Sequence, residues 1–194
     1  RSIIMKEIIQ HFFKYFSQSP FELYNESGLR HELGIFLKKY YPELNVKLDY
    51  PISRMFNPIP KLANKEADIF IIESGVQKHV IELKMPKDEN ASHVDLYRVI
   101  QDLKFLEQLK AQGYDTCTEV FLTKRKNIWE SINGGIYKLF AGDSVNLRSV
   151  KKDEIQPFLI HGGPIELEGT YKAKWEVIHD AKGDEYRYFL VNVK

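Results

Sequence analysis

Three charged residues interrupt two apolar stretches of the sequence: Asp68 lies in ADIFII, and Glu82 and Lys84 lie in VIELK. Charges at the edge of a core are costly to desolvate, so each needs a partner charge, a metal ion or a functional reason. Side chains alternate along a strand, so Glu82 and Lys84 would share one face, and a hairpin through ESGVQ would bring Asp68 close to Glu82. Two carboxylates and an ammonium are therefore expected to meet at one place.

Carboxylate oxygens at such a place would suit Mg²⁺, with Mn²⁺ as a substitute, because Mg²⁺ binds one or two carboxylates together with water and phosphate oxygens. A metal ion would also relieve the repulsion between two adjacent acids, which otherwise raises the pKa of one of them. Lys84 could hold the attacking water or stabilise negative charge that develops on a phosphoryl group. The structural alternative is an exposed cross-strand pair of Glu82 and Lys84 on an edge hairpin.

The surrounding pattern predicts the elements that would hold these residues. Apolar residues at helical spacing indicate helices near 3–16, at 28–41 and from Ser92 to about Gly113. Alternating or continuous apolar runs indicate strands at 45–52, 67–72, 79–85 and 119–123. The order helix, strand, strand, strand, helix, strand predicts a mixed α/β layer.

The C-terminal third differs in character. The segment INGGIYKLFAGDS is rich in turn residues, and 170–194 is typical of two strands around a Lys182-Gly183 turn. We expect residues 1–126 to form the core and residues 127–194 a β-rich extension packed on it, within one structural domain. Alternate residues of a two-stranded ribbon face opposite sides, so one set of its aromatic residues should remain outside to contact DNA or a second subunit. These residues are Tyr171, Trp175, Tyr186, Tyr188 and Phe189.

Asp68, followed after thirteen residues by Glu82-x-Lys84, resembles the PD-(D/E)XK signature of a nuclease superfamily that includes restriction enzymes, Holliday-junction resolvases and repair nucleases. Over residues 25–125 the expected order of elements is also similar, most of all to the nuclease domain of type I restriction motor subunits. Ala67 stands where the signature often has proline. The resemblance implies a restriction-endonuclease-like fold, a restriction or defence setting and Mg²⁺-dependent hydrolysis of DNA. It also implies that Asp68 and Glu82 are metal ligands and Lys84 the catalytic lysine.

Three more polar residues are candidates for the same site. Glu32 lies on the shoulder of the apolar stripe of helix 28–41, and the resemblance implies that it is a further metal ligand in the catalytic set. The alternative is a solvated glutamate, or one paired with Lys39. Tyr97 and Gln101, one turn apart on the next helix, resemble a polar pair that some branches of the superfamily direct at the site; otherwise they are surface residues.

A second acid-x-lysine pattern, Asp102-Leu103-Lys104 after Asp95, falls on the helix expected from Ser92. On a helix Asp102 and Lys104 point about 200° apart. We therefore expect this pattern not to build a site.

Basic residues flank the motif segments and could contact DNA phosphates. They are Lys61, Lys65, Lys87, Lys124, Arg125 and Lys126. A run of charges is more often a solvated face, so these residues are supporting evidence only. The formal net charge of the chain is +1, so DNA binding must depend on local clusters.

Other features narrow the class of protein. The single Cys117 excludes an intramolecular disulfide and a multi-cysteine zinc site, which fits a cytoplasmic protein. Charged residues break the apolar N-terminal segment, so we expect neither a signal peptide nor a membrane contact there. Neither Gly-Gly pair is followed by the Lys-Ser/Thr of a nucleotide-binding P-loop.

The leading interpretation is a metal-dependent DNA endonuclease. One alternative is a catalytically silent relative that binds nucleic acid or protein, although the intact set of two acids and a lysine favours activity. Another is an unrelated α/β binding module. Cutting two strands with one site per chain favours a homodimer or a larger complex.

Overall fold

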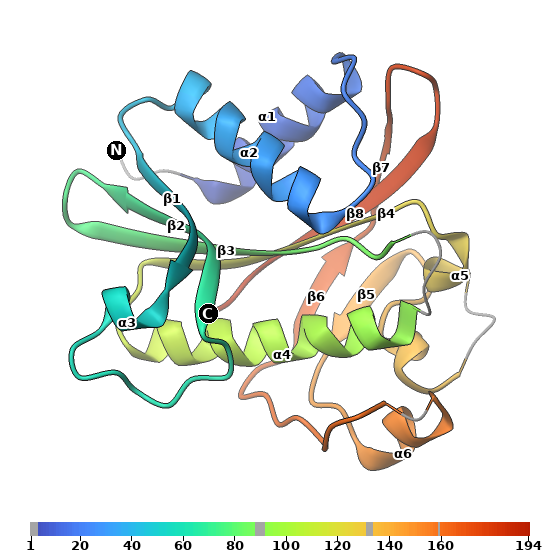
Figure 1. Cartoon of the computed structure of the whole chain (residues 1–194). Coiled ribbons are helices and arrows are strands. Elements are labelled where there is room, and N and C mark those ends of the chain that lie inside the picture. Colours follow the sequence, from blue (N-terminus) through green and yellow to red (C-terminus); the bar gives the residue numbers. More distant parts are fainter. Residues whose placement is uncertain (1–3, 88–91, 131–133, 159) are drawn as a thin grey trace.

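A six-stranded mixed sheet runs through the centre of the molecule in the computed structural model, which describes residues 4–87, 92–130, 134–158 and 160–194 (Figure 1). The strand order is β1-β2-β3-β4-β8-β7, and only the β3–β4 pair is parallel among these neighbours. The bounds are β1 (Asn45–Pro51), β2 (Glu66–Glu73), β3 (Gln77–Lys84), β4 (Thr116–Thr123), β7 (Glu176–His179) and β8 (Glu185–Asn192).

Helices cover both faces of this sheet, with α1 (Met5–Ser17) and α2 (Glu26–Tyr40) on one face and α4 (Ser92–Ala111) on the other (Figure 1). Each face has its own apolar cluster, one built from α1 and α2 and one from α4. The side chain of Asn25 accepts a hydrogen bond from the backbone N–H of Gly28 at 2.7 Å and so caps the start of α2. The mixed α/β class and the predicted order of elements are confirmed.

The two faces of β3 follow the expected alternation. Ile81 and Leu83 pack in the cluster with α1 and α2, whereas Val80 packs in the cluster with α4. Glu82 and Lys84 therefore lie on the α4 side of the sheet. The β2–β3 hairpin turns through Ser74 and Gly75, which both have positive φ angles, and pairs Ile69 with Ile81.

The C-terminal part contributes two strands to the same sheet. β8 pairs with β4 and β7 pairs with β8, around the predicted turn at Lys182-Gly183. The predicted boundary after residue 126 therefore does not separate two sheets. A smaller two-stranded sheet joins β5 (Ser144–Leu147) to β6 (Tyr171–Lys174), so β6 does not belong to the hairpin.

The expectation of outward-facing aromatic residues in this part is wrong. All five predicted aromatic residues are buried. They are Tyr171, Trp175, Tyr186, Tyr188 and Phe189. Three lie on β8, which pairs with β4 and β7, whereas Tyr171 and Trp175 lie before β7 and donate hydrogen bonds to Glu107 and to the carbonyl of Phe140.

Short helical segments complete the fold. They are α3 (Ile52–Met55), α5 (Lys126–Trp129), α6 (Lys152–Ile155) and the 3-10 turns η1 (Gly135–Leu139) and η2 (Gln156–Phe158). Within the described ranges, no helix combines the length and the apolar composition of a membrane span.

Candidate active site

Five acidic side chains gather around Lys84 between β3, β4 and α4, and we call this group the carboxylate cluster. Its acids are Glu26, Asp68, Glu82, Asp102 and Glu119. They come from the start of α2, from β2, from β3, from α4 and from β4. The predicted meeting of Asp68, Glu82 and Lys84 thus involves three further elements, α2, α4 and β4.

Two short hydrogen bonds tie Asp68 to the strand that carries Glu82. The backbone N–H of Asp68 donates to Glu82 Oε2 at 2.9 Å, and the backbone N–H of Leu83 donates to Asp68 Oδ2 at 2.8 Å. Both bonds form just beyond the last paired residues of β2 and β3, Ile69 and Ile81. The side chain of Asp68 thereby reaches across to the backbone of β3 and brings the two acids together.

Lys84 is held between two carboxylates. Its Nζ lies 3.2 Å from Glu26 Oε2 and 3.4 Å from Asp102 Oδ2. Burial by itself would lower the pKa of Lys84, but the negative charges of Asp102 and Glu26 outweigh burial and hold this pKa above its ordinary value. Lys84 therefore stays protonated and cannot act as a general base near neutral pH.

Two neutral or basic residues connect the acids further. The side-chain amide of Asn64 donates to Glu82 Oε1 at 3.0 Å and to Asp102 Oδ1 at 2.9 Å. Arg30, one turn after Glu26 on α2, donates to Asp68 Oδ1 at 2.9 Å and forms an ion pair with Asp49. Asn64 bridges the buried part of the cluster, whereas Arg30 covers its more exposed side.

Glu119 is the acid with the fewest partners. It sits beside Glu82 in the parallel β3–β4 pairing, is 0% exposed, and neither of its carboxylate oxygens has a hydrogen-bond partner among the described residues. Asp102 Oδ2 also lacks a hydrogen bond, although Lys84 is nearby. Buried carboxylate oxygens without partners are costly, so this part of the cluster is unfavourable for the folded state.

The protonation of the cluster reflects this crowding. Burial raises the pKa of Glu82 well above its ordinary value, and the charges of Asp68 and Asp102 raise it further. Burial likewise raises the pKa of Glu119, with Asp102 adding to the effect. The pKa of Asp102 rises to about 6, mainly through burial, although Lys84 opposes the rise. Ionisation of one of these acids raises the pKa of its neighbours, because few cations lie close enough to offset the negative charge.

The donor set of the cluster fits a hard divalent cation. Among the described residues, Lys84 and Arg30 are the cations that form ion pairs with these five acids, so full ionisation of the group would leave a formal charge of 2 − 5 = −3. Among the described residues, however, no three or more His, Cys, Asp or Glu side chains are arranged as a ligand set for a metal ion. Mg²⁺ is often held by only one or two carboxylates, with water and phosphate oxygens completing its coordination.

Access to the cluster is from one side. Glu82 and Lys84 are 2% and 7% exposed, and Asp102 and Glu119 are buried as well. The side chains of Glu26 and Asp68 retain 31% and 17% exposure. A ligand from solvent would therefore meet the start of α2 and Asp68 first.

Glu32 is not part of these contacts. Its side chain is half-buried and forms no hydrogen bond or ion pair with any described residue. From α2 the acid that contacts Lys84 is Glu26, six residues earlier. The predicted role of Glu32 as a further metal ligand stays a prediction.

α4 contributes Asp102 to the cluster, and a role of the predicted pair Tyr97 and Gln101 at the site stays a prediction. Tyr97 donates its hydroxyl to the carbonyl of Gly163 at 2.8 Å, and Gln101 is exposed. The acid-x-lysine pattern on this helix was expected not to build a site, and only its Asp102 lies in the carboxylate cluster, beside Lys84. Lys104 forms no ion pair with a described residue.

The predicted basic contacts lie at the surface. Four of them are exposed: Lys61, Lys65, Lys87 and Lys126. Lys124 forms an ion pair with Asp184 at 3.7 Å, and Arg125 donates to the carbonyl of Lys87 at 3.1 Å. These two residues therefore have structural contacts, and contact with DNA stays a prediction for all six.

Five members of the site were not predicted: Glu26, Arg30, Asn64, Asp102 and Glu119. A signal was present for Glu119, since an acid inside the apolar strand TCTEVFLT resembles the acids that singled out β2 and β3. Comparison of the chain with family models, curated proteins and solved structures finds no match. The function must therefore be argued from the geometry of the cluster.

Proposed function

We propose that the carboxylate cluster hydrolyses phosphodiester bonds of DNA with a divalent cation, Mg²⁺ or Mn²⁺, held by Asp68 and Glu82. The observation that carries the proposal is the direct link between these two acids within a buried excess of carboxylates. Such an excess costs folding free energy unless a ligand neutralises it. When bound, the cation would supply Lewis-acid polarisation of a phosphoryl oxygen and a lowered pKa for bound water.

Lys84 has an electrostatic role in this proposal. Its raised pKa keeps it positively charged, so it stabilises negative charge that develops on the phosphate and does not remove a proton from water. Glu26 and Asp102 orient the ammonium from two sides. The removal of either acid should weaken catalysis by mispositioning Lys84.

In this proposal Arg30 and Asp68 form the entrance to the carboxylate cluster. Both side chains are partly exposed, so a phosphate that approaches Asp68 would pass the guanidinium of Arg30. Arg30 already pairs with Asp49 and Asp68, which fixes its position before substrate binds. A preoriented guanidinium suits the bidentate binding of phosphate oxygens.

The direct test is incubation of the protein with plasmid, branched and single-stranded DNA in the presence of Mg²⁺, Mn²⁺ or EDTA. We expect cleavage with either metal and none with EDTA. Asp68→Asn should remove cleavage, and Glu32→Gln will show whether Glu32 belongs to the metal shell. Wild-type rates for Asp68→Asn would contradict the proposal. A restriction or defence setting and a cytoplasmic location fit this activity.

A binding module without catalysis is the second candidate. The observation in its favour is the burial of Glu82 and Lys84, whose polar atoms already have partners within the protein. Undetectable cleavage of every substrate together with retained DNA binding would establish this candidate.

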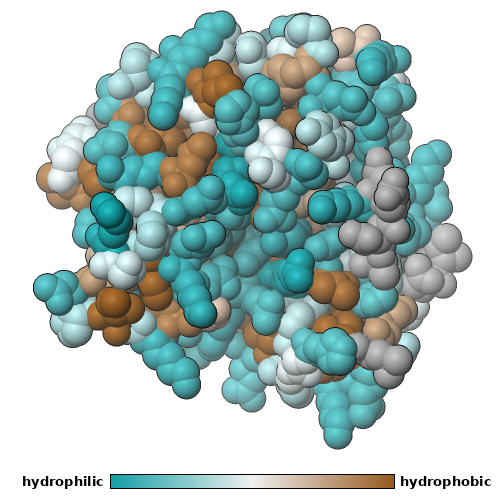
Figure 2. Space-filling view, viewed as in Figure 1, coloured by the Kyte–Doolittle hydropathy of each residue, from teal (hydrophilic) through white to brown (hydrophobic). Residues whose placement is uncertain are grey.

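The surface visible in Figure 2 is mostly hydrophilic, and its apolar side chains form small separate groups. This face therefore offers little support for a hydrophobic dimer interface. Assembly into a homodimer or a larger complex stays part of the proposal, and it can be measured by light scattering with and without DNA.

A further inference from the structure

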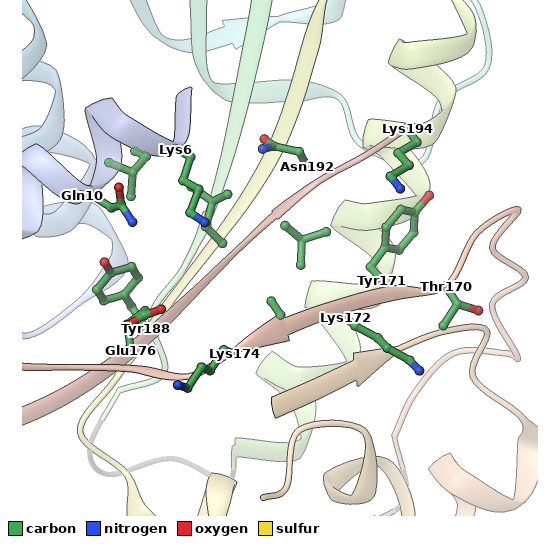
Figure 3. A pocket seen from close by; sticks show the side chains of 14 residues that line it. Lys6, Gln10, Thr170, Tyr171, Lys172, Lys174, Glu176, Tyr188, Asn192 and Lys194 are labelled. Atoms are coloured by element: carbon green, nitrogen blue, oxygen red, sulfur yellow. The ribbon is translucent and has the colours of Figure 1, made fainter. Parts of the chain in front are cut away.

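A groove of about 740 Å³ lies beside the C-terminal half of β8, between α1 and β6 (Figure 3). It exists because β7 pairs with β8 only from Glu185 to Tyr188. Beyond Tyr188, within the described part of the chain, no strand pairs with this edge of β8, since β6 pairs with β5 instead. The sheet is therefore open along the edge of Phe189–Asn192.

Four lysines line this groove: Lys6, Lys172, Lys174 and Lys194. They belong to α1, β6 and the end of the described chain after β8, so only the folded structure brings them together. Lys6 and Lys194 reach over the space beside β8, and Lys172 and Lys174 extend from β6 along the rim (Figure 3). Glu176 is the one acid among the lining residues, which leaves a formal charge of 4 − 1 = +3.

The four ammonium groups have no partner within the described residues. None of them forms an ion pair, a side-chain hydrogen bond or a contact with an aromatic face. Like charges placed together without counterions repel one another. With a net charge of only +1 for the whole chain, this local excess indicates an anionic ligand.

The aromatic residues of the groove are already engaged. Tyr171 donates its hydroxyl to Glu107 Oε2 at 2.7 Å, and Tyr188 stacks on Phe13 with ring centroids 4.0 Å apart. Both rings are also buried, at 8% and 6% exposure, so neither presents an open face on which a base could stack. Recognition would therefore depend on the ammonium groups and would not distinguish base sequences.

We infer that this lysine groove binds the phosphate backbone of a nucleic-acid strand. The inference rests on the proposed function, since it supplies a second contact for the same substrate. Glu82 pairs with Glu119, and Glu119 pairs with Val191 in the wall of the groove. The groove and the cluster are thus two strands apart in the same sheet, although Glu119 itself is buried and a ligand would reach the cluster past Glu26 and Asp68.

The test measures binding without cleavage. Fluorescence anisotropy with labelled single-stranded and duplex oligonucleotides, in EDTA and over a salt series, would compare three proteins. The groove variant changes Lys6, Lys172, Lys174 and Lys194 to Gln. The control variant changes four exposed lysines elsewhere to Gln: Lys14, Lys38, Lys152 and Lys182. The rescue variant changes the four groove lysines to Arg.

We expect the groove variant to bind more weakly and to lose about 3 from the slope of log K against log salt, because each lost phosphate contact removes about 0.7–0.9. The control and rescue variants should keep slopes near that of the wild type. Equal slopes for the groove and control variants would overturn the inference. The inference would also be overturned if polyglutamate bound to the wild type as tightly as the oligonucleotide does. A melting curve of the groove variant shows whether it is folded. If it is not folded, the rescue variant is compared with the wild type and the control variant instead.

The two proposals can fail separately. If the groove variant binds nucleic acid more weakly but the wild type cleaves nothing with Mg²⁺ or Mn²⁺, the inference about the groove stands and the proposed nuclease activity is wrong. If the wild type cleaves DNA in a metal-dependent way and the groove variant binds as tightly as the wild type, the nuclease proposal stands and the inference about the groove is wrong.

Discussion

Glu119 and Glu154 are both buried glutamates, yet their surroundings differ in every respect. Glu154 is 1% exposed and receives hydrogen bonds from Arg148 at 2.8 and 2.9 Å and from the backbone of Lys151 at 3.1 Å, with Lys138 3.2 Å away. Glu119 is 0% exposed and has no hydrogen-bond partner among the described residues. Burial raises the pKa of Glu119, whereas for Glu154 the bonds from Arg148 and Lys151 outweigh burial and lower the pKa to about 2.

The difference shows that burial alone does not determine what a carboxylate does. Around Glu154, cations and N–H groups compensate the charge, and the ion pair stabilises the C-terminal part of the fold. Around Glu119, other acids face the carboxylate, and the folded state bears the cost. A costly arrangement of this kind is typical of sites that bind or transform a ligand.

The largest expected effect is on the cleavage rate, which should depend on the carboxylate cluster and not on the surroundings of Glu154. Asp68→Asn should lower the rate of metal-dependent DNA cleavage by about 10³-fold or more, because loss of a metal-binding carboxylate costs several kcal/mol of transition-state stabilisation. Single-turnover cleavage in Mg²⁺ measures it. Lys84→Gln should show a similar loss, and Lys104→Gln, in the second acid-x-lysine pattern, is its matched control. Equal losses in both lysine variants would contradict the assignment.

The region of Glu154 should instead respond in stability. Arg148→Met removes a bidentate partner from a buried carboxylate and should lower the free energy of unfolding by about 3 kcal/mol. Urea unfolding measures this change. Arg98→Met, at an exposed pair with Asp95, should change stability by no more than about 0.5 kcal/mol. The cleavage rate per folded molecule should be unchanged in Arg148→Met.

Neutralisation of Glu119 should act in the opposite direction. A carboxyl whose pKa is raised on folding makes the protein lose stability as pH increases above the ordinary value of 4.5. Glu119→Gln should therefore increase the free energy of unfolding by about 1–2 kcal/mol at pH 8. The gain should shrink as the pH falls towards and below 4.5, where Glu119 becomes protonated in the unfolded state as well as in the folded state. If Glu119→Gln were less stable than the wild type at pH 8, the negative charge of Glu119 would have to be balanced by a favourable interaction in the folded protein.

The last expected effect concerns the metal itself. Mg²⁺ binds the folded protein in our proposal, so an excess of 100 times its Kd should add about 2.7 kcal/mol of stability. The melting temperature at pH 8 should rise by a few degrees with Mg²⁺ in the wild type and not in Asp68→Asn. The same rise in both proteins would indicate a metal effect outside the cluster.

The sequence predicted the features that depend on short separations along the chain. Asp68 and Glu82 lie on two strands joined by a tight turn, so alternation along each strand suffices to bring them to one end of the hairpin. The helices, the strands of the core and the Lys182-Gly183 turn follow from apolar spacing and turn residues in the same way. These are local patterns, and each can be read within about twenty residues.

Only the tertiary structure decided which distant residues complete the site. The register of the parallel β3–β4 pair places Glu119 beside Glu82, and the rotation of α4 turns Asp102 towards Lys84. The capped start of α2 presents Glu26 to the cluster, a residue that the sequence pattern did not single out. The insertion of β8 beside β4 buries the aromatic residues that were expected outside. Each of these outcomes depends on how separate elements pack, which no local spacing specifies.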